Sequence, residues 1–461
     1  MTDLSLVDLG FLVTETSQSP KHVAGLLVFQ RPEGANKTYV QNVYKTMLGF
    51  DAPSEPFNQT VRLTLGKRPS WQTASDFDIT QHVLFHKAKP KAISVAAVNT
   101  LVAQLHEPQM DRNKPLWELH IIDGISGGKF ALYCKVHHAY ADGITLTKWL
   151  TRSLSGTPDN CAVNAFWAIP STSQAATEKT SRPIKRNRIN SFKNTVRAVA
   201  GLSKISMQWG LEKINLTNNA IAVPFNASHS APLTGQVSGG RQIATARVPM
   251  ERINTIRKLT HSSLNHVALT CVDEALHRYL KDQAKMEEPD VITIQMPVSL
   301  RAHDDESGGN KLGIVLVDLA DKNANLYERL RDIGFALKNV RYQIDNFPAT
   351  SIMAYTILVN MGAQMAESLG LSDKVPPLGH TLVSNVPGPK KSLYLCGSAL
   401  VEMYPISVLS PGNCLNISLF SYAGNLYFGL VATNGLKHLE SLGQHLETAS
   451  QQLEDFIKRP Q

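Results

Sequence analysis

The feature that most constrains this chain is an apolar run, residues 130–136, that stops abruptly at two adjacent histidines. Apolar and aromatic residues dominate the run, so it predicts a buried β-strand. His137 and His138 follow at its end, and Gly143 then favours a tight turn because glycine tolerates backbone angles that other residues resist. We therefore expect both histidines where a strand gives way to a turn, a position from which a side chain can face a cleft.

These histidines suit acid–base chemistry. An imidazole has an unperturbed pKa of about 6.5, so it can accept a proton near neutral pH with little adjustment. A metal site built from His137, His138 and Asp142 is the competing interpretation. Successive strand residues point to opposite faces, however, which argues against one ion shared by both histidines. We therefore expect no metal.

The length of the chain indicates two domains. At 461 residues it exceeds what one hydrophobic core usually serves. Residues 156–235 are rich in Ser, Thr, Asn and Pro and then become basic, so they form the best candidate linker. The sequence thus predicts an N-terminal domain over 1–155, which carries the histidines, and a C-terminal domain over 236–461.

The partners of the chain are expected to be anionic. Its formal net charge is +8, and a basic protein favours nucleic acid, a membrane surface or a phosphorylated small molecule. No nucleic-acid-binding motif is recognisable, which favours the other two. The start of the chain does not resemble a secretory signal, and no apolar run reaches the length of about 18 residues expected of a spanning helix. Five scattered cysteines without a Cys-x-x-Cys pair fit a reducing compartment and argue against a disulfide framework or a structural zinc site. We expect a cytoplasmic protein, soluble or peripheral to a membrane.

The predicted linker contains a strongly basic segment. Between Lys179 and Lys204 the sequence has eight Lys or Arg residues and no Asp or Glu. Apolar residues from Ile189 to Trp209 recur at helical spacing, while Lys193 and Arg197 occupy another sector of that helix. This pattern is typical of a helix that lies on a membrane or lipid-droplet surface, and it is equally compatible with a solvated connector that has one face on the core.

The second half shows its own helix and strand patterns. Ser263 is a candidate N-cap for a helix that continues to residue 280, with Asn265 in its first turn. Strands are predicted over 291–301 and 312–319, and a terminal helix over 439–457. The second half thus alternates predicted helices with predicted strands.

Several motifs together resemble a known family. The pattern His-His-x-x-x-Asp-Gly at 137–143 resembles the active-site motif of the coenzyme A-dependent acyltransferase superfamily. A wider set resembles the bacterial wax ester synthase/diacylglycerol acyltransferase family in order and identity. Its members here are Pro115-Leu116-Trp117-Glu118, Asn265, Pro297 to Arg301, Gly309-Asn310 and Ser384-Asn385-Val386-Pro387-Gly388-Pro389.

The resemblance implies a fold and an activity. The fold would be two chloramphenicol-acetyltransferase-like α/β domains, with mixed sheets flanked by helices and the active site at their interface. The activity would be transfer of a fatty acyl group from acyl-coenzyme A to a long-chain alcohol, giving a wax ester, or to diacylglycerol, giving triacylglycerol. Acyl-coenzyme A is then a substrate, and no cofactor is expected. The runner-up interpretations are transfer to another alcohol or an amine, and a non-catalytic protein that binds lipid surfaces.

The resemblance also implies roles for individual residues. His138 would be the general base that removes the alcohol proton, supported by His137. Asp142 would form a salt bridge with a second-domain Arg, for which Arg301 is the candidate, and Gly143 would be needed for the turn. The substrate-binding residues stay unknown.

The second domain would complete the site. Asn265 would donate a hydrogen bond to the negatively charged oxygen of the tetrahedral intermediate, or would only cap its helix. Ser384 and Asn385 would shape the floor of the cleft. The family usually has Asn-Asp where this chain has Asn265-His266, which puts the role of that Asp in doubt here.

The sequence favours direct transfer without an acyl-enzyme intermediate. Cys134 lies in the predicted strand among apolar residues, where burial makes a thiol inert. No Gly-x-Ser-x-Gly elbow is present to activate a serine. One base between two substrates is sufficient, because the alcohol itself attacks once its proton is removed.

Overall fold

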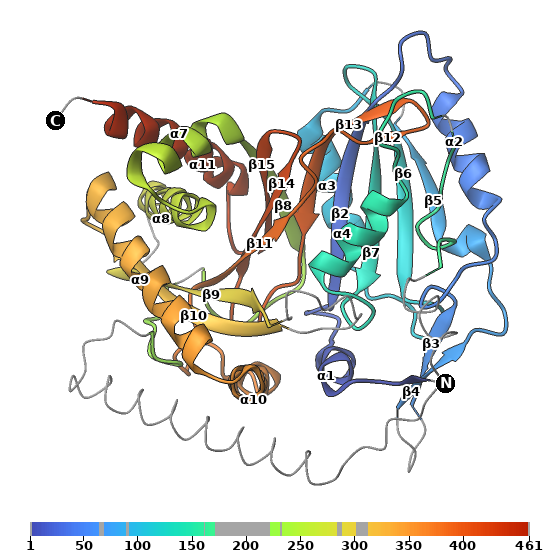
Figure 1. Cartoon of the computed structure of the whole chain (residues 1–461). Coiled ribbons are helices and arrows are strands. Elements are labelled where there is room, and N and C mark those ends of the chain that lie inside the picture. Colours follow the sequence, from blue (N-terminus) through green and yellow to red (C-terminus); the bar gives the residue numbers. More distant parts are fainter. Residues whose placement is uncertain are drawn as a thin grey trace.

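The structure is a computed structural model that describes residues 2–63, 69–88, 92–160, 162–170, 222–230, 233–283, 288–300 and 312–459. Two mixed β-sheets, each with helices against it, lie side by side in the described part of the chain (Figure 1). This arrangement confirms the predicted α/β class with two sheet-based domains. The basic segment over 179–209, Arg301 and Gly309-Asn310 lie outside the described residues.

The first sheet is built mainly from the N-terminal half. Its order is β12-β13-β2-β7-β6-β5, antiparallel except for the parallel pair β5 and β6. The strands from this half are β2 (His22–Gln30), β5 (Val83–Lys87), β6 (Trp117–Ile125) and β7 (Lys129–His137). Its helices are α1 (Leu6–Thr14), α2 (Tyr39–Leu48), α3 (Val95–His106) and α4 (Gly143–Arg152). A small separate sheet contains β1 (Thr2–Asp3), β4 (Ser70–Thr73) and β3 (Gln59–Arg62).

The second sheet has the order β10-β9-β11-β14-β15-β8, with β9, β11 and β14 parallel. Its strands are β8 (Arg241–Pro249), β9 (Val291–Ser299), β10 (Leu312–Asp321), β11 (Thr381–Pro387), β14 (Leu415–Tyr422) and β15 (Asn425–Thr433). The helices of this half are α7 (Met250–Thr260), α8 (Leu264–Asp282), α9 (Leu326–Asn346), α10 (Ala349–Ser368) and α11 (Leu439–Lys458). The side chain of Ser263 accepts a hydrogen bond from the backbone N–H of His266, which confirms the predicted N-cap of α8.

The division of the chain at residue 236 does not separate the two sheets. The strands β12 (Tyr394–Leu395) and β13 (Ser398–Ile406) come from the predicted C-terminal domain but complete the first sheet, where β13 pairs with β2. In Figure 1 the orange β13 stands beside the blue β2. The range 236–461 therefore supplies all of the second sheet and one edge of the first.

The two histidines lie at the end of a β-hairpin formed by β6 and β7. β6 and β7 pair in an antiparallel register that brings Trp117 opposite Val136. The turn between them is short, because β6 continues to Ile125 through an irregularity after Ile122. Gly127 and Gly128, with φ of 76° and 71°, provide the left-handed backbone that the turn requires. The hairpin thus fixes where His137 emerges, at the end of a central strand of the first sheet.

The two sheets are held together by close backbone and aromatic contacts. The hydroxyl of Tyr427 on β15 donates to the carbonyl of Val401 on β13 at 2.8 Å, and that of Tyr422 donates to the carbonyl of Leu400 at 3.0 Å. Both tyrosines, together with Phe420, belong to the hydrophobic core of the first sheet although they lie on strands of the second. Residues from both halves therefore pack into one hydrophobic core along β13, while the second sheet also has a core of its own.

Candidate active site

A cavity of about 560 Å³ lies between the two halves, and His138 lines it. Its walls come from α1, β2 and α4 of the first half and from β9, β10, α10, β11 and the segment 403–411 of the second. Most of the lining side chains are apolar, among them Phe11, Leu146, Met353 and Ile357. A long hydrocarbon chain fits such a lining because it is desolvated without loss of hydrogen bonds.

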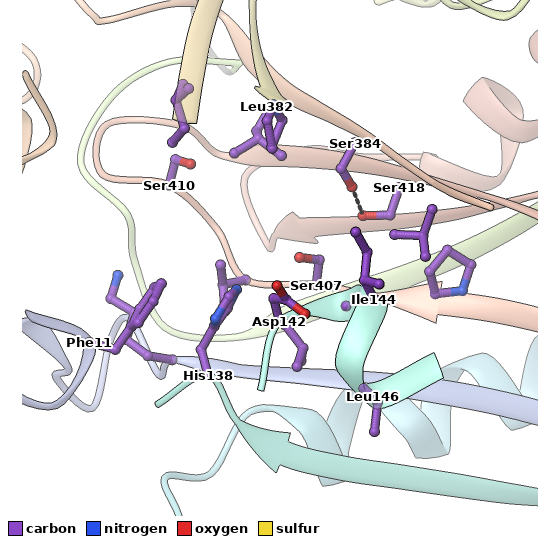
Figure 2. Close-up of a pocket in the computed structure, with 18 of the residues that line it drawn as sticks. Phe11, His138, Asp142, Ile144, Leu146, Leu382, Ser384, Ser407, Ser410 and Ser418 are labelled. Atoms are coloured by element: carbon purple, nitrogen blue, oxygen red, sulfur yellow. Dashed lines mark hydrogen bonds between the residues drawn. The ribbon is translucent and has the colours of Figure 1, made fainter. Parts of the chain in front are cut away.

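His138 lies just after β7, where its side chain enters the cavity. Its ring stacks on Phe11 of α1, with centroids 4.1 Å apart and the planes inclined by 14° (Figure 2). Its backbone N–H donates to the carbonyl of Lys21 at 2.8 Å, which fixes it to the start of β2. Burial lowers the pKa of His138 to about 4, although the nearby Asp142 carboxylate acts in the opposite direction. The imidazole is therefore neutral at pH 7, and a neutral imidazole is the form that can accept a proton.

His137 faces the other side of the strand, where it meets Glu15. Its Nε2 lies 3.5 Å from the Glu15 carboxylate, and its Nδ1 accepts a hydrogen bond from the backbone N–H of Ala139 at 3.1 Å. Burial alone would raise the pKa of Glu15, but His137, the Lys21 backbone N–H and Arg112 lower it to about 2. The supporting role predicted for His137 is consistent with this position behind the cavity wall.

The motif Pro115-Leu116-Trp117 holds the histidine turn in place. The carbonyl of Leu116 accepts from the backbone N–H of His137 at 3.0 Å, and the backbone N–H of Leu116 donates to the hydroxyl oxygen of Tyr140 at 3.1 Å. The Trp117 ring is fully buried, and its Nε1 donates to the carbonyl of Phe57 at 2.9 Å. The motif thus acts on the site through backbone hydrogen bonds to the turn.

Asp142 is buried at the N-terminus of α4. One of its carboxylate oxygens accepts from the backbone N–H of Thr145 at 2.8 Å, so the side chain is the N-cap of this helix. Figure 2 shows Asp142 beside His138 at the base of the cavity. The predicted salt bridge to Arg301 stays a prediction, because Arg301 lies outside the described residues.

Gly143 has a different role from the one expected of it. It is the first residue of α4, and it is not one of the glycines of the described chain that have a positive φ. The expected turn conformation, which only glycine adopts easily, is therefore not found here. A Cβ atom added to Gly143 would lie 3.4 Å from Cγ2 of Val386 on β11. Gly143 therefore lies where α4 packs against the second sheet at the cavity wall, at a spacing that an added methyl group would also fit.

The predicted second-domain residues meet near the cavity. Asn385 donates through Nδ2 to Oδ1 of Asn265 at 2.6 Å, which joins β11 to the first turn of α8. Among the described residues, Ser384 and Asn385 line the cavity whereas Asn265 does not. Ser384 Oγ lies 2.9 Å from Ser418 Oγ in a hydrogen bond that Figure 2 shows above Asp142. Asn265 thus contacts the site through Asn385, and its role as an oxyanion donor stays a prediction.

His266, which replaces the usual Asp of the family, turns away from the cavity. Its Nε2 forms a hydrogen bond with the carbonyl of Leu330 on α9. The ring packs on Gly334, where an added Cβ would approach Cε1 of His266 to 2.4 Å. His266 therefore joins α8 to α9.

Three residues near the histidines are not identifiable from the sequence pattern. Phe11 stacks on His138, Glu15 faces His137, and Lys21 lines the cavity with only 3% of its surface exposed. All three belong to the segment from α1 to the start of β2, far from the motif along the chain. The one signal in the sequence is that two charged residues, Glu15 and Lys21, stand shortly before the apolar strand β2.

Neither a metal site nor a cysteine nucleophile is supported by the described residues. They contain no group of three His, Cys, Asp or Glu side chains placed to hold a metal ion. Cys134 on β7 is fully buried in the core, and burial raises the pKa of its thiol well above the ordinary value. Its position is the apolar one that the sequence predicts.

Two family models match nearly the whole chain. Residues 4–268 match the wax ester synthase/diacylglycerol acyltransferase catalytic domain, and residues 308–454 match the C-terminal domain of that family. A putative diacylglycerol O-acyltransferase of Mycobacterium tuberculosis is 31% identical over 458 residues, which cover 98% of this chain and 100% of the relative. A probable diacylglycerol O-acyltransferase of the same organism is also 31% identical, over 98% of each chain.

Solved structures agree with this result. The wax ester synthase/diacylglycerol acyltransferase of Marinobacter aquaeolei VT8 superposes with a TM-score of 0.75 at 26% identity, covering 99% of this chain and 100% of that one. The first condensation domain of the calcium-dependent antibiotic synthetase shares the fold alone, with a TM-score of 0.60 at 12% identity over 100% and 97% of the two chains. The motif, the fold and these matches agree: this chain is an acyltransferase of the wax ester synthase/diacylglycerol acyltransferase family.

Proposed function

We propose that this enzyme transfers a fatty acyl group from acyl-coenzyme A to the hydroxyl of a long-chain alcohol or of diacylglycerol. The observation that supports this most is the position of His138, a neutral buried imidazole in the wall of a largely apolar cavity between the two halves. The names of its relatives point to the same substrates. A binding protein would have no use for a base at this point.

The proposed reaction needs one base and no cofactor. His138 takes the proton of the acceptor hydroxyl while its oxygen attacks the thioester carbonyl carbon. The carbon–sulfur bond of the tetrahedral intermediate then breaks, and the imidazolium of His138 returns the proton to the coenzyme A thiolate. The products are the ester and free coenzyme A, so atoms and charge balance. Asp142 stabilises the imidazolium by its charge, consistent with its effect on the pKa of His138.

The test is an acceptor screen with the purified protein and palmitoyl-coenzyme A. We expect ester formation with hexadecanol or diacylglycerol, and much less with short alcohols, because these cannot occupy an apolar cavity of this size. Product with a short alcohol or an amine alone would instead favour the runner-up activity. A protein that makes no ester from any acceptor but still binds lipid would be a non-catalytic member of the fold.

The same assay tests direct transfer. Initial-rate plots against both substrates should intersect, and enzyme mixed with palmitoyl-coenzyme A alone should release no burst of coenzyme A. Cys134→Ala should stay active, since the thiol is buried in the core. Parallel plots together with an acyl adduct on the intact protein would contradict this mechanism.

We further propose that the enzyme works at a lipid surface, through an apolar face beside the cavity. Four exposed side chains form this α10 face: Leu358, Met361, Met365 and Leu369 along α10 and its end, each between 63% and 65% exposed. Val13 on α1 is also exposed, at 70%. Figure 1 shows α1 and α10 at the same edge of the molecule. In the described chain no helix is both long and apolar enough to cross a bilayer.

A lipid monolayer or bilayer suits the α10 face for two reasons. The only charged residue within α10 is Glu367, and it is buried, so no charge has to leave water when the face docks. Met361 is also part of the cavity wall, so a water-insoluble substrate can pass from the lipid into the cavity without crossing solvent. An exposed apolar patch next to a substrate cavity commonly marks such an interaction site.

The docking proposal predicts release of one variant from lipid. We expect the wild-type protein to float with vesicles that contain diacylglycerol, also at high salt, because apolar burial is not screened by ions. The triple variant Leu358→Asp, Met365→Asp, Leu369→Asp should stay with the soluble fraction. The matched control is Leu259→Asp, which charges an apolar residue with 55% exposure on α7.

Three outcomes would overturn docking through the α10 face. In the first, the triple variant still floats, whereas a second variant with Lys193→Glu, Arg197→Glu and Lys204→Glu is released at low salt. Lipid binding would then be due to the basic segment over 179–209. A second such outcome is that both variants bind lipid as the wild type does. Finally, the triple substitution could convert a dimer into a monomer in light scattering, which would make the face a contact between two copies of the chain.

A further inference from the structure

Lys21 is a buried cation in the wall of the substrate cavity. It directly precedes β2, and strand alternation places Lys21 and Val23 on the cavity side while His22 points to the opposite side. There, Nε2 of His22 forms a hydrogen bond with the carbonyl of His106 at 2.6 Å. Lys21 thus belongs to the same cavity as the proposed base.

The hydrogen bonds of this ammonium group are incomplete. An ammonium has three N–H donors, and among the described residues Nζ of Lys21 has one acceptor, Ser19 Oγ at 2.7 Å. No carboxylate of the described chain lies within ion-pair distance of Nζ, although the charges of Glu367 and Glu15 act on it from further away. A buried cation with unused donors is costly, and a hydrogen-bond acceptor on a ligand would reduce that cost.

Lys21 is charged under ordinary conditions. Burial lowers the pKa of Lys21 to about 8. The negative charge of Glu367 raises this pKa, and the positive charge of Arg241 lowers it. The side chain therefore stays mostly protonated at pH 7. Its unused donors are thus charged donors, whose hydrogen bonds are stronger than those of neutral groups.

Lys21 is also adjacent to the proposed base. Its carbonyl accepts from the backbone N–H of His138 at 2.8 Å, so the two residues flank the paired strands β2 and β7 at the same end of the sheet. A substrate whose hydroxyl reaches His138 therefore brings its nearest atoms toward the wall that Lys21 forms. The cavity around them is largely apolar, with Phe11 and Val23 close in sequence to Lys21.

We propose that Lys21 selects acyl acceptors that carry a carbonyl oxygen near the reacting hydroxyl, as the ester groups of a diacylglycerol do. This inference rests on the proposed function and chooses between its two acceptor classes. Diacylglycerol places ester carbonyls within a few bonds of its hydroxyl, and these oxygens can accept the unused N–H donors. A simple long-chain alcohol has only methylene groups there, so it covers the ammonium without giving it a partner.

The test compares acceptors that differ only in that oxygen. We would measure kcat/KM with palmitoyl-coenzyme A for 1,2-dipalmitoylglycerol, for its diether analogue 1,2-dihexadecylglycerol, and for hexadecanol. The wild type should prefer the diester to the diether by about 10- to 100-fold, the range expected for a hydrogen bond to a charged group. Lys21→Met should lose more kcat/KM with the diester than with the diether or hexadecanol, so that the preference for the diester disappears. The control is Lys45→Met, the same change at an exposed position on α2.

Each result decides the proposal. If the wild-type enzyme uses the diester and the diether equally well, the proposal is wrong. This comparison needs no variant, so it holds even if Lys21→Met does not fold. A Lys21→Met enzyme that loses the same factor with all three acceptors also overturns it, because Lys21 would then only support the fold or His138. If the wild type makes no ester from any acceptor, the proposed function itself fails, which is a distinct outcome.

Discussion

His138→Ala should lower kcat by about two to four orders of magnitude, the usual contribution of a general base. The alanine enzyme lacks the imidazole that faces the cavity after β7, so the hydroxyl would have to attack without losing its proton to this base. The side chain makes its ring contact with Phe11 and lines an open cavity, so its removal leaves the core of the sheet intact. Steady-state rates with palmitoyl-coenzyme A and the best acceptor measure the effect.

The control for this variant is the neighbouring histidine. His137→Ala should reduce turnover less, because His137 lies behind the cavity wall and acts through Glu15 and the backbone of Ala139. It should instead lower the free energy of unfolding, since the buried Glu15 carboxylate then loses one of its partners. Turnover near the wild-type value in a folded His138→Ala enzyme would refute the assignment of His138 as the base.

Gly429→Ala should destabilise the protein by about 3 kcal/mol or more, at the upper end of what overpacking causes. Gly429 lies on β15 where that strand crosses β13, and an added Cβ would stand 1.7 Å from the carbonyl oxygen of Pro405. Neither strand can move away easily. β13 is paired through Pro405 with Gly25 of β2, and β15 is paired through Gly429 with both Thr245 and Ser418.

Urea unfolding measures this loss, with Gly156→Ala as the matched control. A Cβ added to Gly156 meets no atom within 4 Å, and Gly156 is not among the described glycines with positive φ. Activity should fall together with stability, because Pro405 and Ile406 on β13 are part of the cavity wall. Equal unfolding midpoints for Gly429→Ala and the wild type would show that the two sheets are packed less closely at this crossing than described.

The sequence by itself determined the elements whose signals are local. Examples are the apolar run before His137, the glycine turn that precedes this run, and the N-cap Ser263 at the start of α8. Each is specified by residues within one strand, turn or helical turn. The motif resemblance added the family, the acyltransferase activity and the assignment of His138 as the base. Local periodicity and capping act within a few residues, so they can be read from the chain without knowing the rest of the fold.

Only the tertiary structure decided what crosses between the halves. Strand β13 joins the first sheet although its residues follow most of the second, because a strand pairs with whichever edge its register and buried face fit, at any distance along the chain. The same holds for the surroundings of the proposed base: Phe11, Glu15 and Lys21 carry no motif, and packing alone brings them to the two histidines. A buried side chain acquires its pKa and its partners from neighbours that are remote in sequence, so the chemistry of this site became visible only in three dimensions.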